Sequence, residues 1–153
     1  MSSPEKIVIA VGLPGSGKST YFARLGVHAI SSDAIRLQLA DDETDQTIHA
    51  RVFATVRYLL RQRLALHRSI TFVDATNLTA KERRPYVRMA RAHGCGIEAL
   101  YFDIPLELCK ARNAARGRVV PESAMDSMAA KLTPPTTAEG FDCVLVIRDE
   151  STR

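Results

Sequence analysis

The sequence predicts an α/β protein whose central sheet is mostly parallel and is covered by helices on both faces. Apolar runs with strand character alternate along the chain with segments of helical periodicity, as in parallel sheets buried on both sides. A glycine-rich loop stands between the first run and a helical segment, and the 153 residues contain no internal repeat or linker. We therefore expect one domain spanning residues 1–153. The predicted strands are residues 6–11, 27–31, 69–74, 96–103 and 143–147.

The first half of the chain contains three helical segments. A short helix is expected over about 17–25, after the glycine-rich loop, and the segment SSDAIR opens another after the second strand. The longest candidate covers about 46–67, where apolar residues recur at spacings of three and four. These are Ile48, Val52, Val56, Leu59, Leu60 and Leu64. The other face of this helix carries Arg51, Arg57, Arg61 and Arg63, which could contact a polyanion or simply face solvent.

The second half is punctuated by helix start and stop signals. A helix over about 79–93 has Thr79 at the N-cap, Glu82 at the capping-box position and Gly94 as the stop. Pro105 can open the next helix. A basic loop, RGRVVPE, then precedes a helix of about 121–132 that a pair of prolines ends.

Composition restricts the classes of function. The formal charge of +4 and the sequence pI near 9.2 fit a polyanionic partner only weakly. The N-terminal apolar run is too short and too polar for a signal peptide or a membrane span, so we expect a cytoplasmic protein. Cys95, Cys109 and Cys143 form no CxxC pair and are expected to be buried or half-buried free thiols. The four histidines lack metal-ligand spacing.

The loop GLPGSGKST is the most specific motif in the chain. Gly12, Gly17, Lys18 and Ser19 satisfy the pattern G-x-x-x-x-G-K-[ST], in which backbone amides wrap phosphates, lysine neutralises charge and serine binds Mg²⁺. ATP or another nucleoside triphosphate and Mg²⁺ are the expected ligands, with Ser19 in contact with the metal. The residues expected to hold the nucleotide are Gly12, Leu13, Pro14, Gly15, Ser16, Gly17, Lys18, Ser19 and Thr20.

Two further strands deliver carboxylates to the edge of the sheet where ligands bind. Asp33 and Arg36 lie three residues apart at the start of a helix and suit acceptor-side chemistry, in which a carboxylate takes a hydroxyl proton and a cation holds the acceptor. The alternative is that Asp33 caps the helix, with Ser32 sharing that task, or forms a surface ion pair.

The third strand ends at Asp74, where P-loop proteins place a carboxylate that helps to hold Mg²⁺. Thr76 and Asn77 follow it closely. They could reach the acceptor or solvent, or they could only shape the turn into the next helix.

Arg112 and Arg116 lie four residues apart on the helix that runs into the basic loop, and Arg118 follows two residues later. Like charges at this spacing destabilise a helix, so a shared anion would give the arrangement a physical reason. On a lid around 112–121 that closes over ATP, they would neutralise charge on the transferred phosphoryl group. The alternative is an exposed basic helix end. The adenine contacts are sought near Asn113 and before Cys143.

Taken in this order, GLPGSGKST, SSDAIR, VDATN and RNAARGRVVP resemble the P-loop kinase family that includes phage and bacterial 5′-OH polynucleotide kinases. The similarity runs from about residue 6 to residue 147. It implies a three-layer fold with a five-stranded parallel sheet of order 2-3-1-4-5, flanked by helices. It covers a kinase core without the phosphatase, ligase or methyltransferase module to which such kinases are often joined, which leaves the pathway open.

The resemblance also implies roles for individual residues. Asp33 matches the family's general base and Arg36 its contact to the acceptor phosphate. Lys18 and Ser19 match the triphosphate and metal contacts, and Asp74 falls at the Walker-B-like place. Arg112 and Arg116 match the lid arginines.

Three functions follow from these motifs. The first is an ATP- and Mg²⁺-dependent transfer of the γ-phosphoryl group to a hydroxyl, with the 5′ end of DNA or RNA as the acceptor. The second is a small-molecule kinase that acts on a sugar, a nucleoside or an antibiotic. The third is a nucleotide-dependent regulatory module that transfers nothing, against which the pair Asp33 and Arg36 argues.

Overall fold

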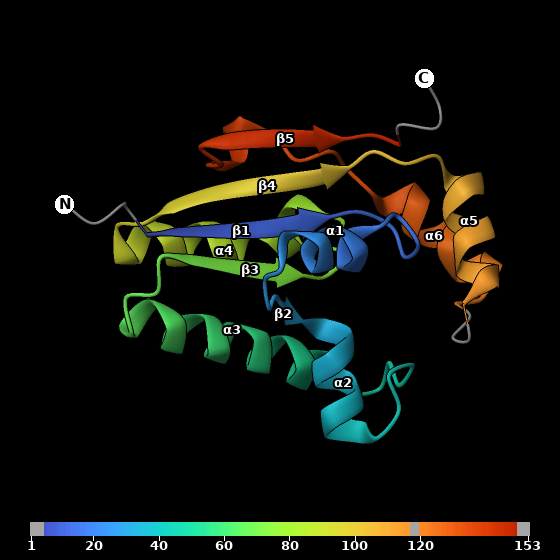
Figure 1. Cartoon of the computed structure of the whole chain (residues 1–153), viewed down its shortest axis with the longest axis horizontal. Coiled ribbons are helices and arrows are strands. Elements are labelled where there is room, and N and C mark those ends of the chain that lie inside the picture. The colour runs from blue at the N-terminus through green and yellow to red at the C-terminus, as the bar shows by residue number, and fades with distance from the viewer. Residues whose placement is uncertain (1–4, 117–119, 150–153) are drawn as a thin grey trace.

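The computed structural model describes residues 5–116 and 120–149. Five strands form one parallel sheet in the order β2-β3-β1-β4-β5, which confirms the predicted topology (Figure 1). The strands are β1 (Lys6–Val11), β2 (Ile30–Ser31), β3 (Ile70–Asp74), β4 (Gly96–Phe102) and β5 (Cys143–Ile147). Because all strands run the same way, the segments that follow β1, β2 and β3 meet at one edge of the sheet.

The central strand β1 is buried on both faces, which explains its continuous apolar sequence. Ile7, Ile9 and Val11 pack into one core cluster, and Val8 and Ala10 pack into a second cluster on the opposite face. Each fully buried valine or isoleucine side chain stabilises the fold by roughly 1.5–3 kcal/mol. The strand therefore fixes the glycine-rich loop that follows it to a rigid base.

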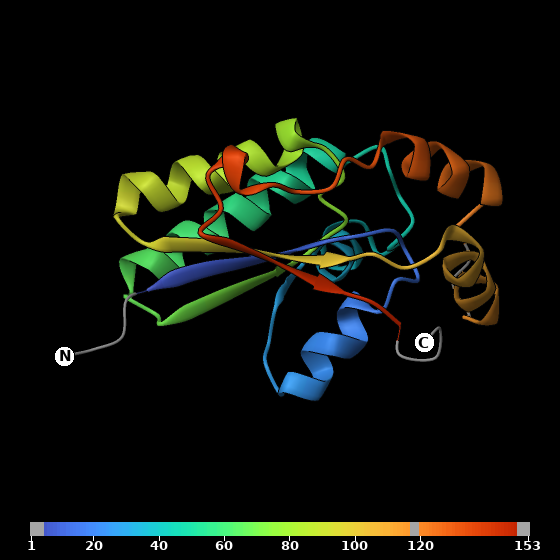
Figure 2. The same ribbon diagram turned by 90° about the horizontal axis from the view of Figure 1, so that it is seen from above.

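Helices cover both faces and give three layers, as predicted (Figure 2). Helices α3 (His49–Ala65) and α4 (Ala80–His93) pack on one face, and α1 (Lys18–Leu25) packs on the other. Helices α5 (Leu106–Ala115) and α6 (Glu122–Lys131) lie beyond the carboxyl ends of the strands. Helix α2 (Ser32–Ala40) follows β2, and a short 3-10 helix, η1 (Thr137–Glu139), precedes β5.

Several boundaries differ from the sequence prediction for local reasons. Strand β2 begins at Ile30 rather than at residue 27, because the N–H groups of Gly26 and Val27 still bond the last carbonyls of α1. Helix α3 begins at His49 rather than at 46, since Asp42 and Asp45 accept hydrogen bonds from the N–H groups two residues later and hold a turn.

Other local predictions are confirmed or corrected in detail. Thr79 caps α4 and Gly94 ends it, but the Glu82 carboxylate accepts its reach-back bond from the Leu78 N–H rather than from the cap residue itself. All three cysteines are free; Cys143 is exposed, contrary to expectation. Across residues 5–116 and 120–149, no helix has the length and apolar character that a membrane span requires.

Candidate active site

The glycine-rich loop joins β1 to α1 and leaves the first amides of that helix available to an anion. Gly17, at the N-cap of α1, has φ 95°, and no side chain within the described ranges caps the helix. Gly15 has φ 80°, and a Cβ added there would lie 2.5 Å from the Cys109 carbonyl oxygen of α5. The loop thus has the open amides, the left-handed backbone and the dipole of a phosphate site.

Gly15→Ala tests this cradle. The substitution strains a left-handed residue by about 1–2 kcal/mol and forces the loop away from α5. We expect ATP affinity, measured by isothermal titration calorimetry, to fall by about tenfold, which corresponds to a loss of about 1.4 kcal/mol of binding free energy. The matched control is Gly26→Ala, which has φ 69° but nothing within 4 Å of its added Cβ. The control should lose only folding stability; equal ATP affinities in the two variants would contradict the assignment.

Lys18 is buried under this loop and points its ammonium at the loop's own carbonyls. The Nζ donates to the oxygens of Gly12 at 3.0 Å and Leu13 at 2.7 Å. Burial lowers the pKa of Lys18 to about 8, although the carboxylates of Asp74 and Asp33 act to raise it. Burial therefore disfavours the charged form of Lys18, and an anion bound beside it would stabilise that form.

This shift predicts a pH dependence of nucleotide binding. Above pH 8 the free protein increasingly carries neutral Lys18, whereas bound phosphates favour the protonated amine, so binding must take up a proton. The ATP dissociation constant should be flat below that pH and rise by up to about tenfold per pH unit above it. Calorimetry in buffers of different ionisation enthalpy measures the proton uptake. Lys18→Met should abolish it; a dissociation constant in the native protein that does not change between about pH 7 and 9.5 would contradict the shift.

Ser19 and Asp74, the two predicted metal ligands, lie together. The Ser19 hydroxyl donates to Asp74 Oδ2 at 2.7 Å. Within the described residues, no group of three or more His, Cys, Asp and Glu side chains could hold a metal by itself. One hydroxyl and one carboxylate nevertheless fit Mg²⁺, which keeps several waters and takes its other ligands from phosphate oxygens.

Asp33 and Arg36 form the predicted pair at the start of α2. The capping interpretation of Asp33 and Ser32 is wrong, because Ser31 is the N-cap and its hydroxyl accepts from the Ala34 N–H at 3.1 Å. Arg36 Nη1 donates to Asp33 Oδ1 at 3.1 Å, with the arginine side chain 6% exposed and the aspartate 47% exposed. Among the described residues, Arg36 Nε has no hydrogen-bond partner. A buried donor of this kind is costly unless an acceptor reaches it, as a substrate phosphate would.

One cavity of about 700 Å³ collects these groups. Its wall includes Lys18, Ser19, Asp33, Arg36, Asp74 and Arg116. Asp33 thus lines the same cavity as the phosphate loop and the two predicted metal ligands, Ser19 and Asp74. We refer to this space as the acceptor cavity.

A second cavity, of about 720 Å³, lies on the other side of the phosphate loop. Gly15, Gly17 and Arg116 line both cavities. Residues that line only the second one include Ser16, Thr20, Tyr21, Phe102, Arg112, Ile147 and Asp149. The loop therefore separates two spaces, as a phosphate chain between a donor and an acceptor requires.

The two arginines predicted for the lid do not share one helix. Arg116 is the C-cap of α5 with an extended backbone, so the expected repulsion between like charges one turn apart is wrong. Arg112 donates to Asp149 Oδ2 at 3.0 Å and lines only the second cavity. The expected lid at 112–121 includes Arg118, which lies outside the described residues together with residues 117 and 119.

Of the two regions in which adenine contacts are sought, the one near Asn113 borders the second cavity through Arg112, whereas the segment before Cys143 does not line it. The buried Asn113 amide bonds both the N–H and the carbonyl of Val120, so it closes the chain around the basic loop. Asp142, just before β5, accepts from the Ile97 N–H near the start of β4, at the sheet edge opposite the phosphate loop. The end of β5, rather than its start, borders the second cavity.

The turn after β3 contains Thr76 and Asn77, which lie in different surroundings. The Asn77 side chain is 2% exposed and donates to the Ala10 carbonyl at 2.8 Å, in a residue with φ 46°. Asn77 therefore shapes the turn. The Thr76 carbonyl accepts from the Gly12 N–H at 3.0 Å, and the residue lines the acceptor cavity. The turn after Asp74 is thus hydrogen-bonded to Ala10 and to Gly12, the two neighbours of the last residue of β1.

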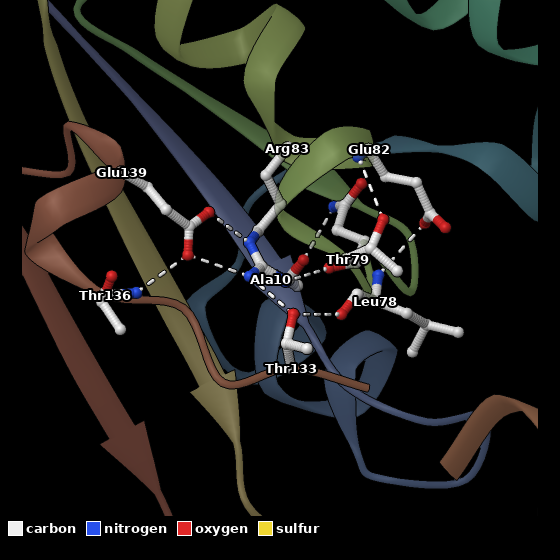
Figure 3. A network of polar contacts seen from close by, with 9 residues as sticks. Ala10, Leu78, Thr79, Glu82, Arg83, Thr133, Thr136 and Glu139 are labelled. Carbon is white, nitrogen blue, oxygen red and sulfur yellow. Dashed lines mark hydrogen bonds and ion pairs between the residues drawn. The ribbon is translucent and has the colours of Figure 1, made fainter. Parts of the chain in front are cut away.

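Sequence reasoning missed the side chain that supports this turn, Arg83 of α4 (Figure 3). Its fully buried guanidinium donates to the Asn77 carbonyl and to Thr133, and it forms two bonds of 2.8 and 2.9 Å with the Glu139 carboxylate. The available signal was that Arg83 occupies the apolar stripe of its helix, three residues before Tyr86 and four before Val87. An arginine in that position requires a buried partner.

Comparison with known proteins assigns the chain to a family. The family model described as AAA domain (AAA_33) matches residues 7–135. L-seryl-tRNA(Sec) kinase of Methanococcus maripaludis is 24% identical over 143 residues, which cover 89% of this chain and 56% of that protein. Bifunctional polynucleotide phosphatase/kinase of Schizosaccharomyces pombe is 26% identical over 149 residues, which cover 92% of this chain and 33% of that protein.

A solved structure shows the same fold. The APS kinase of Mycobacterium tuberculosis, in complex with AMPPNP and APS, superposes with a TM-score of 0.60 at 19% identity, covering 95% of this chain and 90% of that chain. The chain spans about half, or less, of the length of the curated relatives that it matches.

Proposed function

The chain belongs to the AAA domain family, and from that premise we propose that it is an ATP- and Mg²⁺-dependent kinase whose acceptor is the 5′-hydroxyl of a DNA or RNA strand. The observation that carries the proposal is the acceptor cavity, in which the Asp33 carboxylate faces the same space as Lys18 and Ser19 of the phosphate loop. A regulatory module that only binds nucleotide has no need of a carboxylate and a buried arginine at that place.

The residues divide the chemistry among them. Asp33 accepts the proton of the attacking hydroxyl while the new oxygen–phosphorus bond forms and the bond from the γ-phosphorus to ADP breaks. Lys18 and the loop amides hold the terminal phosphates, and Ser19 with Asp74 would hold Mg²⁺, which neutralises charge on the phosphate oxygens. Arg116, which lines both cavities, would stabilise charge on the transferred group.

Three observations support a polynucleotide acceptor. The buried Arg36 has an Nε without a partner among the described residues, which suits a phosphate beside the reacting hydroxyl. His49 and Phe53, whose rings lie 4.6 Å apart, line the acceptor cavity and offer a surface on which a base can stack. One relative is named as a bifunctional polynucleotide phosphatase/kinase, and another as an L-seryl-tRNA(Sec) kinase.

A small-molecule kinase is the second candidate. A cavity of about 700 Å³ also accommodates a sugar or a free nucleoside, and the structure with the same fold is a kinase in complex with APS.

A panel of acceptors separates the candidates. The protein is incubated with γ-labelled ATP and Mg²⁺ together with a 5′-OH oligonucleotide, the same oligonucleotide with a 5′-phosphate, a set of sugars and nucleosides, or no acceptor. We expect label on the 5′-OH oligonucleotide and none on its phosphorylated counterpart. Label confined to a small molecule would establish the second candidate, and ATP binding without transfer to any acceptor would leave only the regulatory module.

A further inference from the structure

Helices α3 and α4 together present a basic surface that the proposed chemistry does not use. We define the basic face as Arg57 and Arg61 of α3 with Arg84 and Arg88 of α4. The two helices lie side by side on one face of the sheet (Figure 2). Arg57 is close enough to the α4 residue Tyr86 for its charge to oppose the rise in the pKa of Tyr86 that burial causes. Arg57 of α3 therefore lies near the helix that carries Arg84 and Arg88.

The charge of this surface is almost entirely of one sign. Helix α3 carries four arginines and no acidic residue, and Glu82 is the single acidic residue of α4. Two other arginines are used structurally: Arg63 bonds Thr71 and the Ile70 carbonyl, and Arg83 bonds Glu139. Within residues 5–116 and 120–149, the four arginines of the basic face make no ion pair with a carboxylate. An ordinary solvated helix face would mix both signs.

The basic face begins where the acceptor cavity ends. Phe53 in the second turn of α3 and Glu82 in the first turn of α4 both line the cavity. Arg57 lies one turn beyond Phe53, and Arg61 lies one turn further. From Phe53 to Arg61 the helix advances about 12 Å, which matches roughly four phosphates at the 3.4 Å spacing of a stacked strand.

We propose that the basic face binds the sugar-phosphate backbone of the acceptor strand, on the 3′ side of the nucleotide whose 5′-hydroxyl enters the cavity. The inference rests on the proposed function and gives it a substrate class, a single strand several nucleotides long rather than a mononucleotide. A polyphosphate chain complements repeated positive charges without requiring any sequence, and DNA and RNA supply the same backbone chemistry.

The test compares acceptors of increasing length with variants of the face. Wild type is assayed with 5′-OH acceptors from a nucleoside 3′-phosphate to a ten-nucleotide strand, as DNA and as RNA. KM for the acceptor should fall with length up to about five nucleotides and then level. Arg61→Gln and Arg88→Gln should each raise the KM of the long acceptor roughly fivefold at 0.1 M salt, and each should lower the salt slope of binding, measured by fluorescence anisotropy, by about 0.7. The kcat and the KM for ATP should not change.

The control is Arg68→Gln, which removes an equal charge from an exposed arginine in the turn between α3 and β3. It should leave KM and the salt slope unchanged. A wild-type KM that is independent of length, or Arg61 and Arg88 variants that behave like the control, would overturn the inference while the proposed function stands. No label on any oligonucleotide would overturn the proposed function and this inference together.

Discussion

Replacing Asp33 with asparagine is expected to remove most phosphoryl transfer while ATP binding stays intact. The substitution keeps the size of the side chain and its place on the first turn of α2 but removes the group that accepts the hydroxyl proton. A lost general base costs about 10²–10⁴-fold in rate. We expect kcat to fall by that factor with the ATP dissociation constant within about twofold of wild type. Single-turnover transfer and calorimetry measure the two quantities separately.

The matched control is Asp41→Asn at the other end of the same helix. Asp41 is exposed and has φ 58°, a conformation in which asparagine is also accepted, so the control changes the same charge without strain. Its turnover should equal that of wild type. An Asp33→Asn enzyme with normal turnover would remove Asp33 from the reaction, and a large loss of ATP affinity in that variant would give it a binding role instead.

The second large effect is on stability. Arg83→Leu leaves the Glu139 carboxylate, which is 17% exposed, without its partner and leaves the Asn77 carbonyl without its donor. Removing one member of a buried pair costs about 3–5 kcal/mol of unfolding free energy, which urea denaturation can measure. Arg84→Leu, at the next position but exposed, should change stability by no more than about 0.5 kcal/mol.

Lowering the pH should reduce the difference in unfolding free energy between wild type and Arg83→Leu. Burial pushes the pKa of Glu139 up, but hydrogen bonds from Arg83 and Thr136 outweigh it and hold the pKa below its usual range. A carboxylate with a lowered pKa contributes stability above its ordinary range and loses it as the pH falls through its folded value. Wild type and Arg83→Leu should therefore converge at acid pH. A double variant, Arg83→Leu with Glu139→Leu, should recover part of the loss; equal stabilities of wild type and Arg83→Leu at neutral pH would contradict the role of the pair.

The parts of the fold that depend on local pattern were predictable. The alternation of apolar runs and helical segments located all five strands and the six α-helices of the described residues. Burial on both faces explains the continuous hydrophobic signal of the central strand β1, whereas the edge strand β5 is apolar although much of it is exposed. The loop from Gly12 to Thr20 and the pairing of Ser19 with Asp74 were also predictable, since strands that run parallel bring their ends to one edge.

The remaining features depend on contacts between distant residues. Strand β2 is only two residues long because the Val27 N–H bonds the Phe22 carbonyl at the end of α1 and does not join the sheet. Ser31, Ser32 and Asp33 are all residue types that suit an N-cap, so the sequence does not show which of them takes the role; the structure places Ser31 there, with an extended backbone. The supporting network of Arg83 joins residues 50 and 56 positions apart in sequence, so no local pattern could reveal its partners.

The central claim is that the Asp33 carboxylate meets the acceptor hydroxyl across from the terminal phosphate held by the loop. Its most direct test is a crystal structure of the protein with AMPPNP, Mg²⁺ and a short 5′-OH oligonucleotide. The account predicts the 5′ oxygen within about 2.6–3.2 Å of the Asp33 carboxylate and in line with the terminal phosphorus. An acceptor bound outside this cavity, or an Asp33 side chain turned away from its hydroxyl, would contradict the account.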